Sequence, residues 1–133
     1  MSNNIVDLAL FCDMLYLMKR FRESFGHAFD GLVYVWREER NFKIQIFIGI
    51  LVILGMFFVN FSYEAMGLMV VAIVLVLGAE TINTAFEDTL NKIEPNHDPV
   101  IGRIKDIAAG FVVLSVFGAI IIGVFAVLSY FSL

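Results

Sequence analysis

Cysteine and positive charge are both scarce in this 133-residue sequence. A single cysteine, Cys12, excludes an intramolecular disulfide, and no Cys and His residues stand at the spacing of a structural zinc site. Nine Lys and Arg against thirteen Asp and Glu give a net charge of −4, so we expect no nucleic-acid partner, because phosphate binding needs a basic surplus. Charged residues make up only 17% of the chain and hydrophobic residues 60%, which excludes an ordinary water-soluble domain.

Three apolar runs dominate the sequence, and they cover residues 44–59, 65–79 and 107–128. Gln45 is the one polar residue of the first run, and Ser115 is the one polar residue of the third. A membrane span needs about 20 mostly apolar residues, and a soluble chain of this length could not cover three such buried helices. The sequence therefore predicts transmembrane helices at 43–61, 65–91 and 104–130.

The basic residues predict the orientation of these spans. All nine lie before the first span, at its first residue, or around the connection between the second and third spans. The link at 60–64 and the tail at 129–133 carry no Lys or Arg. By the positive-inside rule, we expect the N-terminus in the cytoplasm and the C-terminus outside.

The segment before the first span has the periodicity of an amphipathic helix, because apolar side chains recur every three or four residues at Phe21, Phe25, Phe29, Leu32 and Trp36. We expect residues 1–42 to form an interfacial helix region. The basic residues of this segment begin only at Lys19, which is not the charge order of a cleavable signal peptide, so we expect the mature protein to be the whole chain. No repeat or composition break divides residues 1–133, which predicts a single domain.

Polar residues gather at the inner end of the second span. At about 100° per residue, one helix face presents Glu80, Asn83, Thr84, Glu87 and Asn91. Ionisable groups at this depth are costly and are candidates for function. Glu80 directly follows the apolar run, so we expect a desolvated carboxylate that suits a general base or a metal-linked acid. The alternative is a solvated face where the helix leaves the membrane.

Two further charged clusters are expected on the same membrane face: Glu38-Glu39 before the first span, and Lys105-Asp106 at the start of the third. Carboxylates without His or Cys suit a hard cation such as Mg²⁺ that bridges phosphate oxygens, and Lys105 adds a positive charge for the same phosphates. Alternatively, each cluster is an ordinary surface pair. No P-loop or Rossmann glycine motif occurs, so we expect a nucleotide to be held in another way.

Four separated motifs follow one another in a single order. They are F-x-x-A-x-x-G at 25–31, E-R-N-F at 39–42, E-T-I-N-T-A-F-E at 80–87, and K-D at 105–106 followed by A-A-G at 108–110. Together they resemble the small three-span prokaryotic diacylglycerol kinases and undecaprenol kinases, whose signature is E-x-x-N-[ST]-A-x-E. The resemblance runs from about Arg20 to the C-terminus. Asn91 stands where the family usually has Asp, and residues 1–18 are longer and more apolar than usual.

This resemblance implies an all-α membrane protein of the bacterial cytoplasmic membrane that assembles as a homotrimer with its sites between subunits. It implies direct transfer of the γ-phosphoryl group of ATP to a lipid hydroxyl, with Mg²⁺. The E-R-N-F entrance and Pro99 are more similar to the Gram-positive undecaprenol kinases, so undecaprenol is the expected acceptor and undecaprenyl phosphate the product. The alternative is a diacylglycerol kinase that makes phosphatidic acid.

The resemblance also implies roles for individual residues. Glu80 is the expected general base, Asn83 orients the catalytic groups, and Glu39 and Glu87 hold Mg²⁺ on the nucleotide phosphates. Further nucleotide contacts are expected from Lys105, Asp106, Arg20, Asn96, His97 and Asp98. The lipid substrate is expected to contact Arg20, Phe25, Ala28 and Glu80.

Two other readings of the charged face stay open. In the first, the chain is a non-catalytic membrane scaffold, in which the acidic face pairs with basic residues of neighbours and ATP never binds. In the second, which three spans make weaker, Glu80 and Glu87 line the path of a cation-transporting subunit. A kinase assay on the two lipids distinguishes these classes.

Overall fold

The computed structural model describes residues 2–59 and 61–131, with side chains from residue 13 onward. Four helices account for almost all of this chain: α1 (Ser2–Glu38), α2 (Arg40–Phe58), α3 (Tyr63–Ile93) and α4 (Pro99–Phe131). The described residues contain no strand. They divide into two compact units, Met1–Arg37 and Glu38–Leu133.

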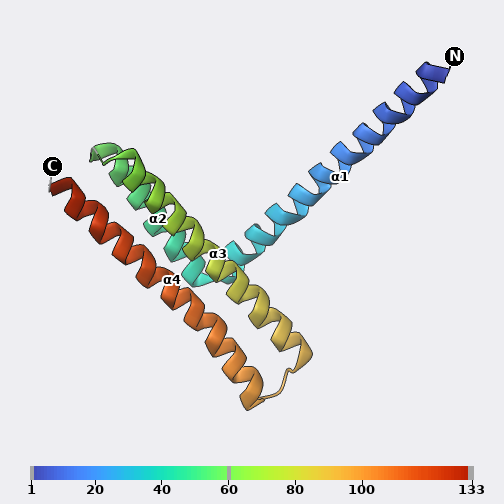
Figure 1. Ribbon diagram of the computed structural model, residues 1–133. Helices are drawn as coiled ribbons and strands as arrows, with labels where there is room; N and C mark the ends of the chain where they lie inside the picture. The colour runs from blue at the N-terminus through green and yellow to red at the C-terminus, as the bar shows by residue number, and fades with distance from the viewer. Residues whose placement is uncertain (1, 60, 132–133) are drawn as a thin grey trace. The chain divides into compact units, whose positions relative to one another are not determined.

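The first unit consists of α1, a single long helix (Figure 1). Large apolar side chains at helical spacing, including Phe21, Phe25 and Phe29, are exposed along it. The rings of Phe21 and Phe25 lie 4.7 Å apart between centroids, as expected for neighbours at i and i+4. The predicted helix is therefore present, and its position in the membrane interface stays a prediction.

The second unit is built from α2, α3 and α4, and α3 packs against both of the others (Figure 1). All three are long and apolar enough to cross a membrane, which confirms the predicted all-α membrane fold with three spans. Most of their large apolar side chains are exposed in the single chain, which suits a surface that meets lipid or further protein. The homotrimer stays a prediction.

Two contacts hold these helices together at different levels. The core cluster comprises Met56, Ala65, Met69 and Ala126, with one or more residues from each of the three helices. Farther along, α2 comes close to α3 at Gly49, where an added Cβ would lie 3.1 Å from the Cγ2 atom of Ile73. The absent side chain thus permits the close approach of these two helices.

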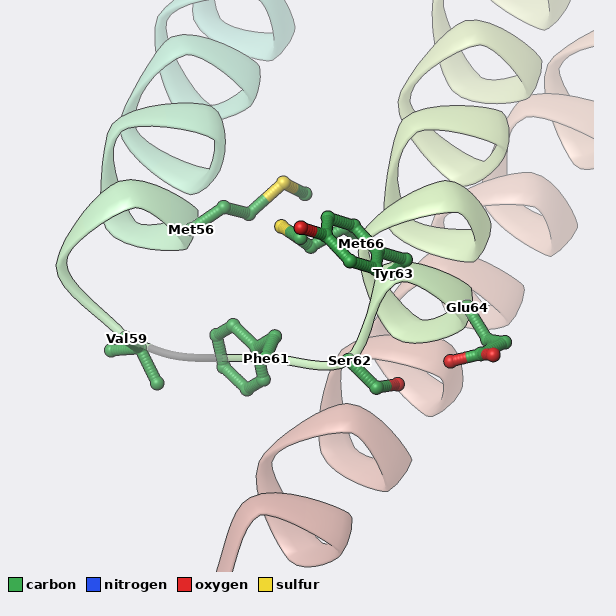
Figure 2. Close-up of a pocket in the computed structure, with 7 residues that line it drawn as sticks. All are labelled: Met56, Val59, Phe61, Ser62, Tyr63, Glu64 and Met66. Atoms are coloured by element: carbon green, nitrogen blue, oxygen red, sulfur yellow. The ribbon is translucent and has the colours of Figure 1, made fainter.

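An open pocket of about 360 Å³ lies at the connection between α2 and α3 (Figure 2). Met56 from α2 and Met66 from α3 both line it (Figure 2), and Met66 packs against the core cluster that contains Met56. The hydroxyl oxygen of Ser62 accepts a hydrogen bond from the backbone N–H of Ala65 at 3.2 Å and so caps the start of α3. From Glu64 to Glu80 is 16 residues, or about 24 Å of helix, so this pocket is remote from the acidic face.

The helix ends differ from the expected spans where local polar groups decide them. Helix α4 begins at Pro99, five residues before the expected span, because the Asp98 carboxylate accepts hydrogen bonds from the backbone N–H groups of Val100 and Ile101 at 2.7 and 3.0 Å. Asp98 is thus the N-cap and Pro99 the first helical residue, a position that favours proline. Helix α3 ends at Ile93, two residues before Pro95.

Candidate active site

Glu80 is a buried carboxylate inside the helical unit, with only 3% of its surface exposed. It follows the buried residues Val76 and Ala79 on the face of α3 that packs inward. The side-chain amide of Gln45 on α2 donates a hydrogen bond from Nε2 to Oε2 of Glu80 at 3.0 Å. This bond joins the one polar residue of the first apolar run to the first polar residue after the second run.

The same amide leaves its other polar atom without a partner. Oε1 of Gln45 is buried and accepts no hydrogen bond from any residue that the structure describes. A buried acceptor left unpaired costs about 1–3 kcal/mol, and native proteins seldom retain such a group without a reason. The sequence reasoning did not include Gln45 among the site residues, although its position as the lone polar interruption of an apolar run was the available signal.

The polar face of α3 changes from buried to exposed along its length. Glu80 and Thr84 are buried, Asn83 is half-buried, and Glu87 and Asn91 are exposed. The hydroxyl group of Thr84 donates to the backbone oxygen of Glu80 at 3.0 Å, so this buried hydroxyl is satisfied within its own helix. A ligand that reached Glu80 from the helix end would therefore pass Glu87 first.

Glu39 brings a second carboxylate to this region from the start of α2. It is the N-cap residue, with extended backbone angles of φ −95° and ψ 115°, yet its side chain makes no capping hydrogen bond. Burial is the main cause that raises the pKa of Glu39, and repulsion from Glu80, Glu87, Asp88 and its neighbour Glu38 raises it further. Carboxylates from α2 and α3 therefore lie close enough to repel one another.

A lysine from α4 stands beside this acidic face. Nζ of Lys105 donates a hydrogen bond to Oδ1 of Asn91 at 2.5 Å, which links α4 to α3. Asn91 is four residues, or about 6 Å along the helix, beyond Glu87. Because the amide of Asn91 is neutral, the bond orients Lys105 without neutralising its charge, which suits a contact with an anionic ligand. The adjacent Asp106 is exposed.

Residues of the connection between α3 and α4 have mainly local partners. The backbone N–H of Asn96 donates to Oε1 of Glu94 at 3.0 Å, and the carboxylate of Asp98 caps α4. Asn96 and His97 are exposed. The capping role of Asp98 was not foreseen, although an Asp-Pro pair before an apolar run is a helix-start signal. Contacts of these residues with a nucleotide stay predictions.

Three of the expected site residues belong to the first unit. Arg20, Phe25 and Ala28 are exposed on α1, and the guanidinium carbon of Arg20 lies 5.9 Å from the ring centroid of Tyr16 on the same helix. Their approach to the nucleotide or the lipid stays a prediction.

The carboxylates of this region fit a magnesium ion that is shared with phosphates. Within the described part of the chain, no group of three or more His, Cys, Asp or Glu side chains is arranged to hold a metal by itself. Mg²⁺ is commonly bound by one or two carboxylates plus substrate phosphates and waters, so a complete protein cage is not required. Glu39, with no capping bond and with its charge opposed by acidic neighbours, has the chemistry of such a ligand.

An apolar groove of about 380 Å³ runs between the three helices of the second unit. Its lining residues come from α2, α3 and α4, and they are Gln45, Ile48, Gly49, Val52, Ile73, Val76, Leu77, Val116, Ala119, Ile120 and Gly123. Gln45 is the one amide side chain in this lining, and its amide also contacts Glu80. The groove thus adjoins the buried carboxylate.

The fold and the site define a class of protein: a membrane protein with three spanning helices that carries carboxylates and a lysine toward one end of its helical unit. The family model for prokaryotic diacylglycerol kinase matches residues 26–127. The chain therefore belongs to the prokaryotic diacylglycerol kinase family, a family of lipid kinases, which confirms the resemblance seen in its motifs.

Individual relatives carry two different names. A diacylglycerol kinase of Synechocystis sp. is 31% identical over 101 residues, which are 75% of this chain and 58% of that protein. An undecaprenol kinase of Bacillus subtilis is 33% identical over 106 residues, 80% of this chain and 86% of that protein. A diacylglycerol kinase of Pseudomonas aeruginosa is 28% identical over 101 residues, 74% and 82% respectively. The match thus spans little more than half of the Synechocystis protein.

Proposed function

We propose that this protein transfers the γ-phosphoryl group of ATP to the hydroxyl group of a membrane lipid alcohol. The observation that carries the proposal is the approach of Glu39 on α2 to Glu80 and Glu87 on α3, with Lys105 of α4 beside the same helix face. Phosphoryl transfer asks a protein mainly to position its reactants and to neutralise charge, and this set of side chains suits both tasks.

Undecaprenol is the proposed acceptor, and undecaprenyl phosphate the product. The E-R-N-F motif at 39–42 and Pro99 favour it through their similarity to undecaprenol kinases. The apolar groove beside Glu80 suits a long hydrocarbon chain whose hydroxyl end reaches the carboxylate. Diacylglycerol is the alternative acceptor, because relatives of similar identity bear both names.

In the proposed reaction, Glu80 takes the proton of the lipid hydroxyl group. An electron pair of the lipid oxygen forms the new bond to the γ-phosphorus, the bond to the β,γ-bridging oxygen breaks, and ADP leaves. Asn83, one turn from Glu80, orients the catalytic groups, and Lys105 neutralises phosphate charge. Glu39 and Glu87 would hold Mg²⁺, which supplies further positive charge to the phosphates when it is bound.

The remaining nucleotide and lipid contacts are proposed from the family motifs. Asp106 anchors the nucleotide, and Asn96, His97 and Asp98 border it in the loop before α4. Arg20 contacts a phosphate group or the lipid, while Phe25 and Ala28 on α1 contact the lipid.

A homotrimer with sites between subunits is part of the proposal. Gly118 of α4 is exposed, and open space surrounds the position that an added Cβ would take there. Small residues exposed on membrane helices are typical of contacts with further helices. The charge distribution supports an N-terminus in the cytoplasm, where ATP is, and a C-terminus on the outer side of the bacterial membrane.

The test is a kinase assay on the full-length protein in micelles, with labelled ATP and either undecaprenol or diacylglycerol. We expect transfer by the wild type and a loss of about 10²- to 10⁴-fold in Glu80→Gln, the usual contribution of a general base. Glu64→Gln, at the opposite end of α3, is the matched control and should retain the wild-type rate. Inactivity of the wild type on both lipids, or full activity of Glu80→Gln, refutes the proposal. The ratio of the two rates identifies the acceptor.

A further inference from the structure

The bond between Gln45 and Glu80 is a polar contact between two spans. Gln45 is the sixth residue of α2, and its amide reaches across to α3. A carboxylate only accepts hydrogen bonds, so Glu80 requires the amide N–H of Gln45 to face it. With Nε2 facing Glu80, Oε1 of Gln45 lies where no described residue donates a hydrogen bond to it. An apolar side chain at position 45 would avoid this cost, which points to a use for the amide.

We propose that Gln45 is a positioning residue that holds the carboxylate of Glu80 ready to take the proton of the lipid hydroxyl. This inference rests on the proposed function and adds a residue that the family motifs do not include. The hydrogen bond from Nε2 fixes Oε2 of Glu80, and in this proposal the other carboxylate oxygen takes the proton. Gln45 also lines the apolar groove, so the amide stands where a lipid chain in that groove would bring its hydroxyl group to Glu80.

The unpaired amide oxygen has a use in the same step. When the lipid hydroxyl gives its proton to Glu80, the carboxylate becomes a carboxylic acid, which is a hydrogen-bond donor. Oε1 of Gln45 is bonded to the same carbon as Nε2, so the acceptor lies beside the donor that already contacts Glu80. One amide thus offers Glu80 a donor before the proton transfer and an acceptor after it.

The charged residues around this pair explain why a neutral partner suits the position. Glu39, at the start of α2, lies close enough to Glu80 for the two carboxylates to repel each other, and Glu87 and Asp88 of α3 repel Glu39 as well. Helix α4 has no charged residue after Asp106, so it presents only apolar side chains and glycines where it lines the groove. A second acid at position 45 would add to the repulsion, whereas an amide donates a hydrogen bond without charge.

Three substitutions separate positioning from packing. Gln45→Met keeps the length of the side chain and removes the N–H. Gln45→His keeps an N–H donor at about the same reach, and Gln45→Glu keeps the shape but replaces the donor with a carboxylate. We expect kcat to fall about 10- to 100-fold in Gln45→Met, the usual cost of losing an outer partner of a functional group, while the KM for ATP stays within about twofold. Gln45→His should retain clearly more activity than Gln45→Met, and Gln45→Glu should retain the least.

If Gln45 only packs, the three variants should rank differently in activity. Met is the best apolar match for the shape of Gln, so Gln45→Met should then be the most active variant. The control is Thr81→Val, which removes a half-buried hydroxyl group that donates only to the backbone oxygen of Leu77 at 2.8 Å. This variant should keep the wild-type kcat. If Gln45→Met does not assemble, the comparison of Gln45→His with Gln45→Glu decides, and equal rates in these two overturn the inference.

Failure of this inference is distinguishable from failure of the proposed function. A wild type that phosphorylates neither lipid, or a fully active Glu80→Gln, refutes both the proposed function and this inference. An active wild type with an inactive Glu80→Gln, combined with a Gln45→Met that equals the wild type or exceeds Gln45→His, removes the inference alone.

Discussion

Replacing Glu39 by Gln should stabilise the metal-free protein while it removes kinase activity. The structure supplies two opposing contributions. A negative charge at a helix N-terminus is worth about 0.3–1 kcal/mol, and this benefit is lost in the variant. No capping hydrogen bond is lost, because the Glu39 side chain makes none. Against this, burial and repulsion from neighbouring carboxylates raise the pKa of Glu39, so the surroundings as a whole disfavour its charge.

The net effect therefore favours the neutral variant. One unit of pKa corresponds to about 1.4 kcal/mol, and a partly exposed group retains only a fraction of that after solvent screening. We expect Glu39→Gln to gain on the order of 1 kcal/mol or less, which is roughly 4 °C in Tm for a chain of this size.

The pH dependence fixes the sign of this argument. The pKa of Glu39 is higher in the folded protein than its ordinary value of 4.5, so no charge penalty exists at a pH below that value. The penalty develops as the pH rises through the raised pKa and is complete above it. The Tm difference between Glu39→Gln and the metal-free wild type should vanish in acid and reach its full size near neutral pH.

The assay is thermal denaturation in micelles at these two pH values, with and without Mg²⁺, alongside the kinase assay. Mg²⁺ with ATP should raise the Tm of the wild type more than that of Glu39→Gln. The kinase activity of Glu39→Gln should be about 10- to 100-fold lower than that of the wild type, or lower still. Glu38→Gln is the control, since it removes an adjacent exposed carboxylate and should keep the activity. A Glu39→Gln protein that is less stable than the wild type at neutral pH without metal would refute the repulsion argument.

Two further substitutions test the packing and the capping. Gly49→Ala places a methyl group 3.1 Å from Cγ2 of Ile73, so an overpacking cost of about 1–3 kcal/mol should outweigh a helix-propensity gain of about 0.5–1 kcal/mol. The control Gly55→Ala has open space around the new methyl group and should be neutral or stabilising. Equal Tm values for the two variants would contradict the close approach of α2 to α3 at Gly49. Asp98→Ala should cost about 1 kcal/mol through the lost cap of α4, and Asp98→Asn should restore most of it in the same denaturation assay. A stable Asp98→Ala would show that the cap is unimportant.

Much of the fold could be predicted from composition and periodicity. The three spans follow from long apolar runs, which the bilayer permits only as helices in a chain of this kind. The ends of the helices were less predictable, because single polar groups decide them. The start of α4 depends on a carboxylate that bonds two backbone N–H groups, and the break between α1 and α2 falls at Glu39 alone.

The candidate site could likewise be predicted only in part from the sequence. Helical spacing is enough to align Glu80, Asn83 and Glu87, since the geometry of one helix is fixed by its backbone. Spacing does not say which residue of another helix lies opposite. Gln45 and Glu80 are 35 residues apart in the chain, and nothing in either local pattern pairs them. The topology of the spans predicts Glu39 on the same membrane face as the acidic end of α3, but it does not say how closely Glu39 approaches Glu80 and Glu87.

The amino-acid sequence alone determined that this chain enters a membrane and that one face of a helix is acidic, because hydropathy and helical period are properties of consecutive residues. Only the tertiary structure decided that Gln45 of α2 donates to Glu80 and that Lys105 of α4 donates to Asn91. Such contacts depend on how separate helices pack, and packing is a property of the whole helical unit instead of any one segment.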